Sequence, residues 1–181
     1  MNASDRALIL QAQDGSVDAF SELVERNWVW LVRFARSVAG GADAEDIVQE
    51  SLVAAWSRMS SLRDPDAFPA WLLRIVARRC FRNARKRARW VPLPMSTDYI
   101  DPAGCSPAES VDVERVLNIL PVRQRAVMHF TVIEGRSDSE IGALLGIAAA
   151  SVRAHRRRAR ATLRTALGEP RIEKGLSHEI T

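Results

Sequence analysis

An unusual group of carboxylates lies in the segment DAEDIVQE, residues 43–50, which has four acidic side chains and no basic one. Acidic residues at this density can bind a divalent cation, favour the start of a helix, or contact a positively charged partner. Asp43 and Glu45 fall in a first helical turn, where the helix dipole favours negative charge. Asp46 and Glu50 are one turn apart and repel each other, so helix stability does not account for them.

Metal binding has the least support among these explanations. Carboxylate sites in helical bundles draw ligands from facing helices, commonly as Glu-x-x-His pairs, and no such pair occurs in the chain. The three histidines show no ligand spacing, and Cys80 and Cys105 lie far from any CxxC spacing. We therefore expect no metal, no cofactor and no catalytic residue. A metal-dependent hydrolase remains an alternative hypothesis, which would require these carboxylates to bind metal.

Helix geometry divides the acidic segment into two sides. At about 100° per residue, an apolar side gathers around Val48 and would face the core. Its other members are Ala44, Leu52, Ala55 and Met59. The opposite side consists of Asp46, Gln49, Glu50, Val53 and Ser57, and the first four are the expected contact residues. An exposed valine with a polar rim is typical of a small protein interface, so we expect this side to contact a basic protein partner.

Two basic stretches without an acid indicate nucleic acid binding, although the net charge is only +4 and the pI is about 9.8. The first consists of Arg74, Arg78, Arg79, Arg82, Arg85, Lys86, Arg87 and Arg89, and the second of Arg153, Arg156, Arg157, Arg158, Arg160 and Arg164. Aromatic residues on which separated bases could stack accompany the first stretch: Phe68, Trp71, Phe81 and Trp90. Phe68 also shares a helical spacing with Leu72 and Val76, so a core position is its alternative.

The apolar spacing predicts an all-α protein. Helical periodicity covers about 5–39, 43–59, 69–89, 122–133 and 149–167, and no strand pattern occurs. We expect two small helical domains, residues 1–90 and 107–168, a flexible proline-containing linker at 91–106, and a disordered tail at 169–181. No apolar run approaches the about 18 residues that cross a bilayer, and no signal peptide is evident. These patterns predict a cytoplasmic protein without membrane insertion.

Capping patterns mark where the helices begin and end. Gly40 and Gly41 are expected to end the first helix, and Asp43 with Asp46 resembles a reciprocal cap at the start of the next. The sequence SPAE, residues 106–109, has the pattern of a capping box at the start of the second domain.

The segment SDSEIGALLGIAAASVRAHRRRAR, residues 137–160, has the form of a helix-turn-helix. Ser137 and Glu140 form a capping box, and Gly146 supplies the turn. In the second helix Val152, Ala159, Leu163 and Ala166 fall on the core side. We expect Ser151, Arg153, Ala154 and Arg157 to lie nearest to base edges, and Arg158 and Arg160 to contact phosphates. Arg156 leans toward the core, where we expect its stem to follow the apolar surface.

These segments together resemble an extracytoplasmic-function (ECF) sigma factor of bacterial RNA polymerase. The resemblance rests on DAEDIVQESLVAAW, then FPAWLLRIVARR leading into a basic helix, a proline-containing linker, and the segment from LPVRQRAV through the helix-turn-helix. It covers about residues 5–167 and implies two domains, region 2 and region 4. A protein of this kind binds core RNA polymerase, directs it to promoters, and has no catalytic residues of its own.

The resemblance also implies a role for each set of residues. The helix matching 43–56 would dock on the clamp helices of the polymerase β′ subunit through Asp46, Gln49, Glu50 and Val53, with the β subunit as a further contact. The loop and helix at about 60–89 would recognise and melt the minus-ten element through Arg63, Asp64, Phe68, Trp71, Arg74, Arg78, Arg82 and Arg85. The helix-turn-helix would bind minus-thirty-five DNA through Ser151, Arg153, Ala154, Arg157, Arg158 and Arg160. An anti-sigma factor is a further candidate partner.

Two departures concern the minus-ten helix, because relatives commonly have asparagine at the position of Arg78 and aspartate at that of Arg82. Both changes add positive charge and are expected to raise affinity for a DNA strand. A stand-alone helix-turn-helix regulator remains the second hypothesis, but it gives no reason for the acidic helix or for the aromatic and basic residues before the linker.

Overall fold

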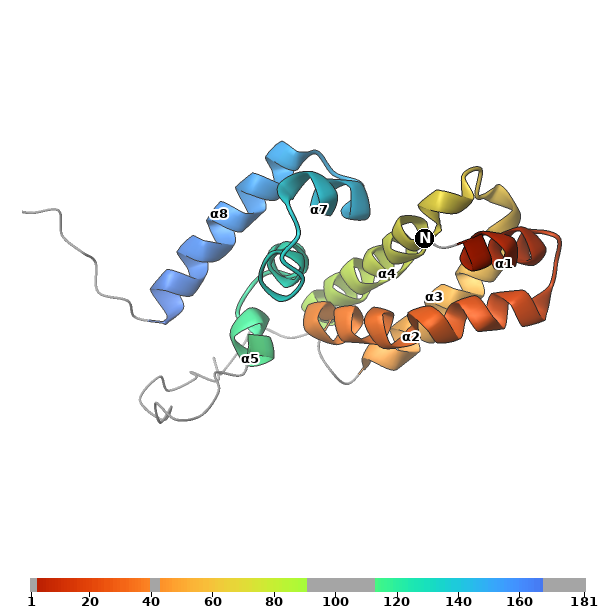
Figure 1. Cartoon of the computed structure of the whole chain (residues 1–181). Helices are drawn as coiled ribbons and strands as arrows, with labels where there is room; N and C mark the ends of the chain where they lie inside the picture. The colour runs from red at the N-terminus through yellow and green to blue at the C-terminus, as the bar shows by residue number, and fades with distance from the viewer. Residues whose placement is uncertain (1–2, 40–42, 91–112, 168–181) are drawn as a thin grey trace, which may run out of the picture.

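A computed structural model describes residues 3–39, 43–90 and 113–167, and within these ranges the regular elements are all helical (Figure 1). The N-terminal half contains α1 (Ala3–Gln13), α2 (Val17–Ala39), α3 (Ala44–Trp56) and α4 (Phe68–Trp90), with short 3-10 turns η2 (Met59–Ser61) and η3 (Pro65–Ala67) before α4. The C-terminal half contains α5 (Val113–Asn118), α6 (Val122–Met128), the π-helical turn η5 (His129–Ile133), α7 (Asp138–Leu145) and α8 (Ala149–Ala166). The predicted fold class is confirmed.

The first expected helix is divided in two. Gly15 has a φ of +97°, which favours glycine, and separates α1 from α2. The hydroxyl of Ser16 accepts a hydrogen bond from the Ala19 N–H at 3.2 Å and so caps α2. The interpretation of 5–39 as one continuous periodic segment was therefore wrong at this turn, because apolar spacing resumes on its far side.

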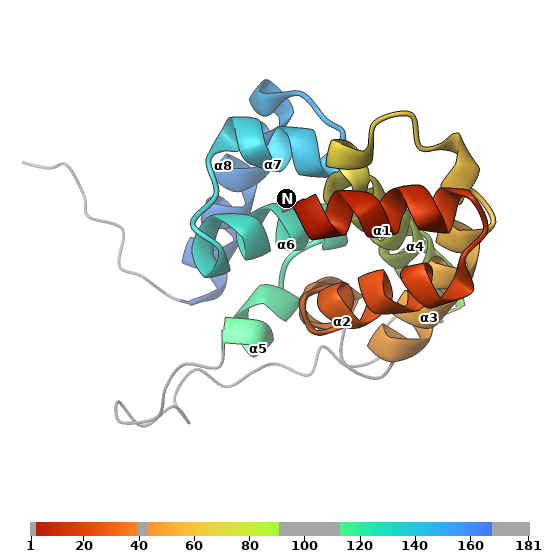
Figure 2. The same ribbon diagram turned by 45° about the vertical axis from the view of Figure 1, so that its right-hand side comes forward.

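Helices α3 and α4 pack against each other and against α2 (Figures 1 and 2). The apolar side predicted for α3 is buried: Ala44, Val48 and Ala55 have no exposed surface, and Leu52 is 8% exposed. In α4 the residues Leu72, Leu73, Val76 and Cys80 form the corresponding buried stripe. Each helix is therefore held in the N-terminal half by one apolar side.

The predicted reciprocal cap at the start of α3 is wrong. Asp43 is the N-cap residue, but its side chain accepts no hydrogen bond from the helix backbone. Its Oδ2 instead accepts a hydrogen bond from Asn83 Nδ2 at 3.1 Å and lies 3.6 Å from Arg87 Nη1. Asp43 thus ties the start of α3 to α4. Gly40 and Gly41, expected to end the preceding helix, lie outside the described residues.

The helix-turn-helix forms as predicted. Ser137 and Glu140 make both hydrogen bonds of the capping box at the start of α7. Gly146 ends that helix with a φ of +67°, and α8 follows after a short turn. Gly135, which follows η5 and precedes α7, also has a positive φ of +63°.

The two halves share one apolar core. The main cluster of buried side chains extends from the first four helices to Ala126, Val127, Phe130, Ile141 and Val152 of the C-terminal half. A smaller cluster within that half consists of Leu117, Leu120, Met128 and Ala159. In Figure 2, α6 lies between α2 and α4 on one side and α8 on the other. The domains are thus in direct contact with each other.

Several expectations concern segments outside the described residues. These are the linker at 91–106, the capping box at 106–109 and the tail at 169–181. Among the described helices, none has the length and apolar character needed to cross a membrane.

Candidate functional site

The acidic side of α3 faces outward. Asp46, Gln49 and Glu50 are exposed, and Val53 is 71% exposed. The helical geometry that separated these residues from the core side therefore predicted their positions correctly. Together they form a small apolar centre with a polar, negatively charged margin, which we call the α3 outer face.

Part of the negative charge on the α3 outer face is balanced within the chain. Glu50 forms an ion pair with Arg79 of α4. A cleft of about 280 Å³ lies between the two helices, lined by Asp43, Asp46, Ile47, Glu50, Arg79, Arg82, Asn83 and Lys86. Within the described part of the chain Asp46 has no ion-pair partner. We expected both Asp46 and Glu50 to need a partner outside the chain. Because Glu50 already has Arg79, this expectation now concerns Asp46.

The loop before α4 contains two of the predicted minus-ten residues. Arg63 and Asp64 are both exposed. Asp64 Oδ1 accepts a hydrogen bond from the Asp66 N–H at 3.0 Å and so caps the turn that Pro65 begins. Asp66 in turn pairs with Arg6 of α1 at 3.2 Å. The loop therefore has a defined shape, and Arg63 extends from it.

The predicted minus-ten residues of α4 differ in their exposure. Phe68 is 2% exposed, so it offers no ring face to a DNA strand, and the core alternative holds in this structure. Trp71 is half-buried, with its ring centroid 6.0 Å from that of Phe68. Arg74 is also half-buried, and its Nε donates to the Ala70 carbonyl at 3.1 Å. The remaining three, Arg78, Arg82 and Arg85, are exposed.

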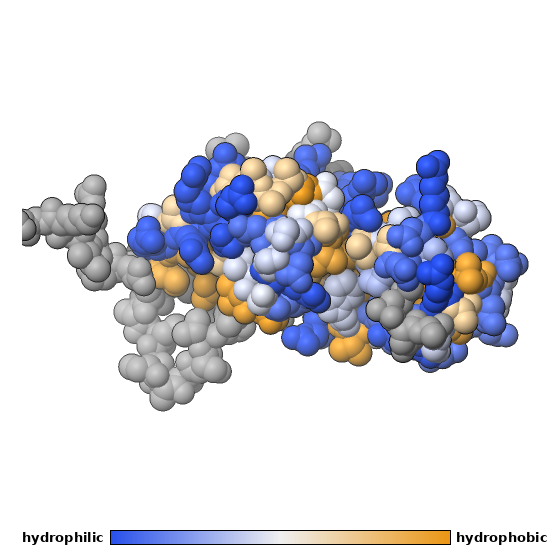
Figure 3. Space-filling view, turned by 45° about the horizontal axis from the view of Figure 1, so that its top comes forward, coloured by the Kyte–Doolittle hydropathy of each residue, from blue (hydrophilic) through white to orange (hydrophobic). Residues whose placement is uncertain are grey.

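Helix α8 presents its basic side to the outside. Val152 and Ala159 have no exposed surface and anchor the helix. The predicted minus-thirty-five residues Ser151, Arg153, Arg157, Arg158 and Arg160 are exposed, and Ala154 is half-buried. Ala166 is exposed, so its predicted core position is wrong. In Figure 1 α8 lies on the far side of the molecule from α1 and α3, and Figure 3 shows hydrophilic side chains toward both ends of one face.

Arg156 has a partner that the sequence did not predict. Its Nη1 lies 2.6 Å from Asp138 Oδ1, and its Nη2 donates to Asp138 Oδ2 at 3.1 Å. The expectation that its stem merely follows the apolar surface was wrong, because the guanidinium ties α8 to the first turn of α7.

Burial lowers the pKa of His155, which neighbours Arg156 in α8, and the charges of Arg158 and Arg123 lower this pKa further. This histidine is therefore neutral near pH 7.

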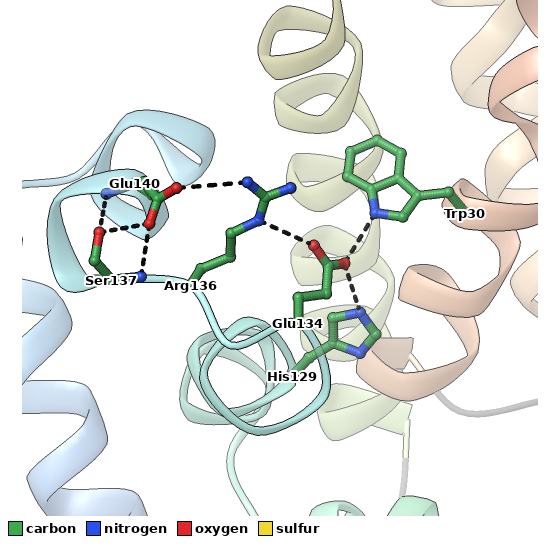
Figure 4. A network of polar contacts seen from close by, with 6 residues as sticks. All are labelled: Trp30, His129, Glu134, Arg136, Ser137 and Glu140. Atoms are coloured by element: carbon green, nitrogen blue, oxygen red, sulfur yellow. Dashed lines mark hydrogen bonds and ion pairs between the residues drawn. The ribbon is translucent and has the colours of Figure 1, made fainter.

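A polar network that sequence analysis missed connects the two halves (Figure 4). Glu134 Oε1 accepts a hydrogen bond from Trp30 Nε1 at 2.9 Å and lies 3.4 Å from His129 Nε2. Glu134 Oε2 lies 3.5 Å from Arg136 Nε, and Arg136 Nη1 lies 3.5 Å from Glu140 Oε1. Hydrogen bonds from Ser137 lower the pKa of Glu140. Glu134 thus joins the C-terminal half to α2 through its hydrogen bond with Trp30.

His129 is nearly buried in the same network, with 3% of its side chain exposed. Burial lowers the pKa of His129, which outweighs the opposite effect of Glu134, and the charge of Arg33 lowers it as well. The imidazole is therefore neutral near pH 7. Among the described residues, this network included, no group of three or more His, Cys, Asp or Glu side chains is placed to hold a metal ion.

Comparison with protein families gives two matches along the chain. Residues 23–90 match the model of sigma-70 region 2, and residues 110–163 match that of sigma-70 region 4. The ECF RNA polymerase sigma factor SigM of Mycobacterium tuberculosis is 31% identical over 91% of this chain and 85% of its own length. The RNA polymerase sigma factor CnrH of Cupriavidus metallidurans is 34% identical over 88% of this chain and 92% of its own length.

Two solved structures share the arrangement of helices. CnrH in complex with the cytosolic domain of CnrY has a TM-score of 0.63 at 33% identity, covering 91% of this chain and 97% of that one. The sigma factor RpoE of Bartonella quintana, in complex with the anti-sigma factor NepR, also has a TM-score of 0.63, at 25% identity, covering 86% of this chain and all of that one.

Proposed function

Because this chain belongs to the extracytoplasmic-function family of RNA polymerase sigma factors, we propose that the α3 outer face binds core RNA polymerase and that α4 and α8 contact promoter DNA. The protein is an alternative sigma factor that directs promoter-specific transcription initiation, and it is not an enzyme. Family membership displaces the hypotheses of a stand-alone regulator and of a metal-dependent hydrolase.

The observation that carries the proposal for α3 is the contrast between its two sides. Ala44, Val48 and Ala55 have no exposed surface, whereas Val53 is 71% exposed between outward carboxylates. Only one of these carboxylates, Glu50, has an ion-pair partner among the described residues. A basic surface of the polymerase would balance Asp46 and cover Val53. We assign this basic polymerase surface to the clamp helices of the β′ subunit. The β subunit is a further proposed partner of the protein.

The DNA-binding roles follow from exposure and charge. On α4 the arginines Arg78, Arg82 and Arg85 can follow the phosphates of a separated strand, with Arg63 beside them and Trp71 as the ring for base stacking. Asp64 shapes the loop, and Phe68 supports Trp71 from the core. Arg74 is half-buried, and we assign it to the same contact with the separated strand.

On α8 the small residues Ser151 and Ala154 allow a close approach of the helix to a major groove. Arg153 and Arg157 would then reach base edges of the minus-thirty-five element, while Arg158 and Arg160 bind phosphates. We assign residues 1–90 to region 2, 91–106 to the linker and 107–168 to region 4.

Further partners follow by analogy with the relatives. The solved structure of RpoE contains the anti-sigma factor NepR, and that of CnrH contains the cytosolic domain of CnrY. We propose that a protein regulator of this kind also binds the present chain. The sigma factor itself would act in the cytoplasm, where core polymerase and promoters are found.

The α3 outer face is tested by reversing the charge of Asp46. Asp46→Lys is preferable to a change at Glu50, because Glu50 also holds Arg79. We expect the affinity of the full chain for core polymerase to fall about 10-fold to 100-fold, which corresponds to about 1.4–2.8 kcal/mol. The matched control is Glu25→Lys, which places the same charge change at an exposed position of α2.

Core affinity is measured by fluorescence anisotropy, and initiation is scored on a library of promoter fragments. Binding of Asp46→Lys equal to that of the Glu25→Lys control would remove the α3 outer face from the polymerase interface. If the wild-type chain neither bound core polymerase nor initiated on any promoter, the proposed function itself would fail.

A further inference from the structure

Helix α1 contains none of the residues proposed to bind polymerase or DNA, yet it packs against a loop that does. The match to sigma-70 region 2 begins at residue 23, so α1 lies before it. Besides α2, α1 contacts the turns η2 and η3, which lie in the segment that joins α3 to α4 (Figures 1 and 2). We call this segment, residues 57–67, the α3–α4 loop. It carries Arg63 and Asp64, two of the proposed minus-ten residues.

The α3–α4 loop is anchored by apolar side chains at every third position. Met59 is 2% exposed, Leu62 is 6% exposed, and Pro65 is buried. Arg63 and Asp64 lie between the last two anchors and are exposed. The direction in which they point therefore depends on the backbone that spans the anchors.

Gln13, the last residue of α1, holds this backbone. Its Nε2 donates to the Leu62 carbonyl at 2.5 Å and to the Met59 carbonyl at 3.4 Å. The Leu62 carbonyl and the Arg63 N–H belong to one planar peptide unit, which moves as a whole. The bond from Gln13 therefore fixes the peptide unit from which Arg63 extends.

Arg6 forms a second tie between α1 and the loop. Its Nη1 lies 3.2 Å from Asp66 Oδ2, and the N–H of Asp66 donates to the Asp64 side chain that caps the turn. The side chains of Arg6 and Asp66 are 54% and 62% exposed, and ion pairs with such exposure contribute little to stability. Gln13 is therefore the stronger of the two ties.

We propose that α1 is a brace for the α3–α4 loop, in which Gln13 positions the peptide unit before Arg63 and thereby sets the base preference at the minus-ten element. Gln13 acts through the loop and is a positioning residue, with Arg6 as a secondary one. A loop ordered before DNA arrives loses less conformational entropy on binding, and it presents Arg63 and Asp64 to the bases in one arrangement. The effect on base preference rests on the proposed role of the loop in minus-ten recognition, whereas the brace itself does not.

The brace is tested by amide hydrogen exchange of the full chain, followed by mass spectrometry. The amides of Ser61, Leu62 and Ala67 donate to carbonyls within the loop, so their exchange reports how often the loop opens. Gln13→Met keeps the length of the side chain and removes the donor. We expect exchange of these amides to be about 3-fold to 10-fold faster in this variant than in the wild type.

The matched control is Gln11→Met, which makes the same replacement at an exposed position of α1. It should leave loop exchange at the wild-type rate. Equal loop exchange in Gln13→Met and Gln11→Met would overturn the brace.

A second pair of variants serves if Gln13→Met does not fold. Arg6→Glu alone should speed loop exchange, and adding Asp66→Arg should restore it by forming the ion pair with its charges exchanged. Absence of this restoration would then overturn the brace.

Base preference is measured with holoenzyme assembled from the full chain and core polymerase. The promoter fragments carry a randomised minus-ten element and a fixed minus-thirty-five element. In Gln13→Met the difference in initiation between preferred and disfavoured minus-ten sequences should shrink about 3-fold to 10-fold, which corresponds to about 0.7–1.4 kcal/mol. A general loss of stability would instead lower initiation on all fragments alike.

Arg63→Ala is the reference for the role of the loop itself. If Arg63→Ala changes the minus-ten preference and Gln13→Met does not, the effect of the brace on base preference is overturned. If neither variant changes it, the proposed role of the loop in minus-ten recognition fails, and hydrogen exchange alone decides whether the brace exists.

Discussion

The ion pair between Asp138 and Arg156 gives a prediction whose size follows from the structure. The pair joins the first turn of α7 to α8 through contacts of 2.6 and 3.1 Å. Its side chains are 17% and 27% exposed, respectively, which is between the surface and the interior. Exposed pairs contribute about 0.2–1 kcal/mol, and breaking a fully buried pair costs about 3–5 kcal/mol. We therefore expect a coupling energy of about 1–2 kcal/mol.

A double-mutant cycle isolates this coupling. Asp138→Asn removes the charge with little change of shape, and Arg156→Met keeps an apolar stem while removing the guanidinium. The carboxylate at the start of α7 also interacts with the helix dipole, by about 0.3–1 kcal/mol, and the cycle subtracts this separate effect. The free energy of unfolding is measured by urea titration of the full chain, monitored by circular dichroism.

The affinity for minus-thirty-five duplex DNA should fall in both single variants, because α8 loses its tie to α7. The double variant should be less destabilised than the sum of the single variants by the coupling energy. A coupling energy within about 0.3 kcal/mol of zero would refute the reasoning, since additive effects indicate independent sites. In that case Arg156 would contribute only through its stem.

Three further predictions concern the C-terminal half. Gly142→Ala would place a Cβ 2.7 Å from the Ile147 carbonyl oxygen, so thermal unfolding should show a destabilisation of about 1–3 kcal/mol. The free energy of unfolding should decline as the pH falls below about 6.5 toward the lowered pKa of His129, and urea titrations of His129→Gln at pH 7.5 and 5.5 should show less decline. Arg153→Ala should alter the preferred minus-thirty-five sequence in a binding selection, whereas Arg160→Ala should weaken binding to all sequences and reduce its salt dependence.

Local patterns in the sequence predicted the local structure well. The apolar side of α3, the capping box at Ser137 and the turn at Gly146 were all expected, and each depends on residues a few positions apart. Spacing of this kind determines which side of a helix is apolar. It therefore also predicted the exposed residues of α3 and the exposed arginines of α8, although Ala166 was wrongly placed on the core side.

Contacts between distant residues could not be predicted in the same way. Trp30 and Glu134 are separated by 104 positions, and neither residue type indicates its partner. Helical periodicity defines the apolar side of α6 but not the surface that it meets. The structure was therefore needed to identify the contacts between the halves. It was also needed to identify the ion pair of Asp138 with Arg156.

Phe68 shows how two valid patterns can conflict at one residue. Its position among aromatic and basic residues favoured a DNA contact, while its spacing with Leu72 and Val76 favoured the core. The core position prevails because all three residues fall on the buried side of α4, where burying a phenylalanine ring stabilises the fold by about 1.5–3 kcal/mol. Trp71, three residues farther along α4, is partly exposed and is therefore the better candidate for stacking with a DNA base.

The arginines along α4 differ in how directly they can take part in the proposed DNA contact. Arg74, Arg78 and Arg82 follow each other at intervals of one helical turn, so they form a single row of positive charge. Arg74 is half-buried and lies against the end of α7, whereas Arg78 and Arg82 are exposed. In the proposed DNA-binding role, the two exposed members are therefore the ones placed to attract phosphates, and this attraction is long-range and sensitive to salt.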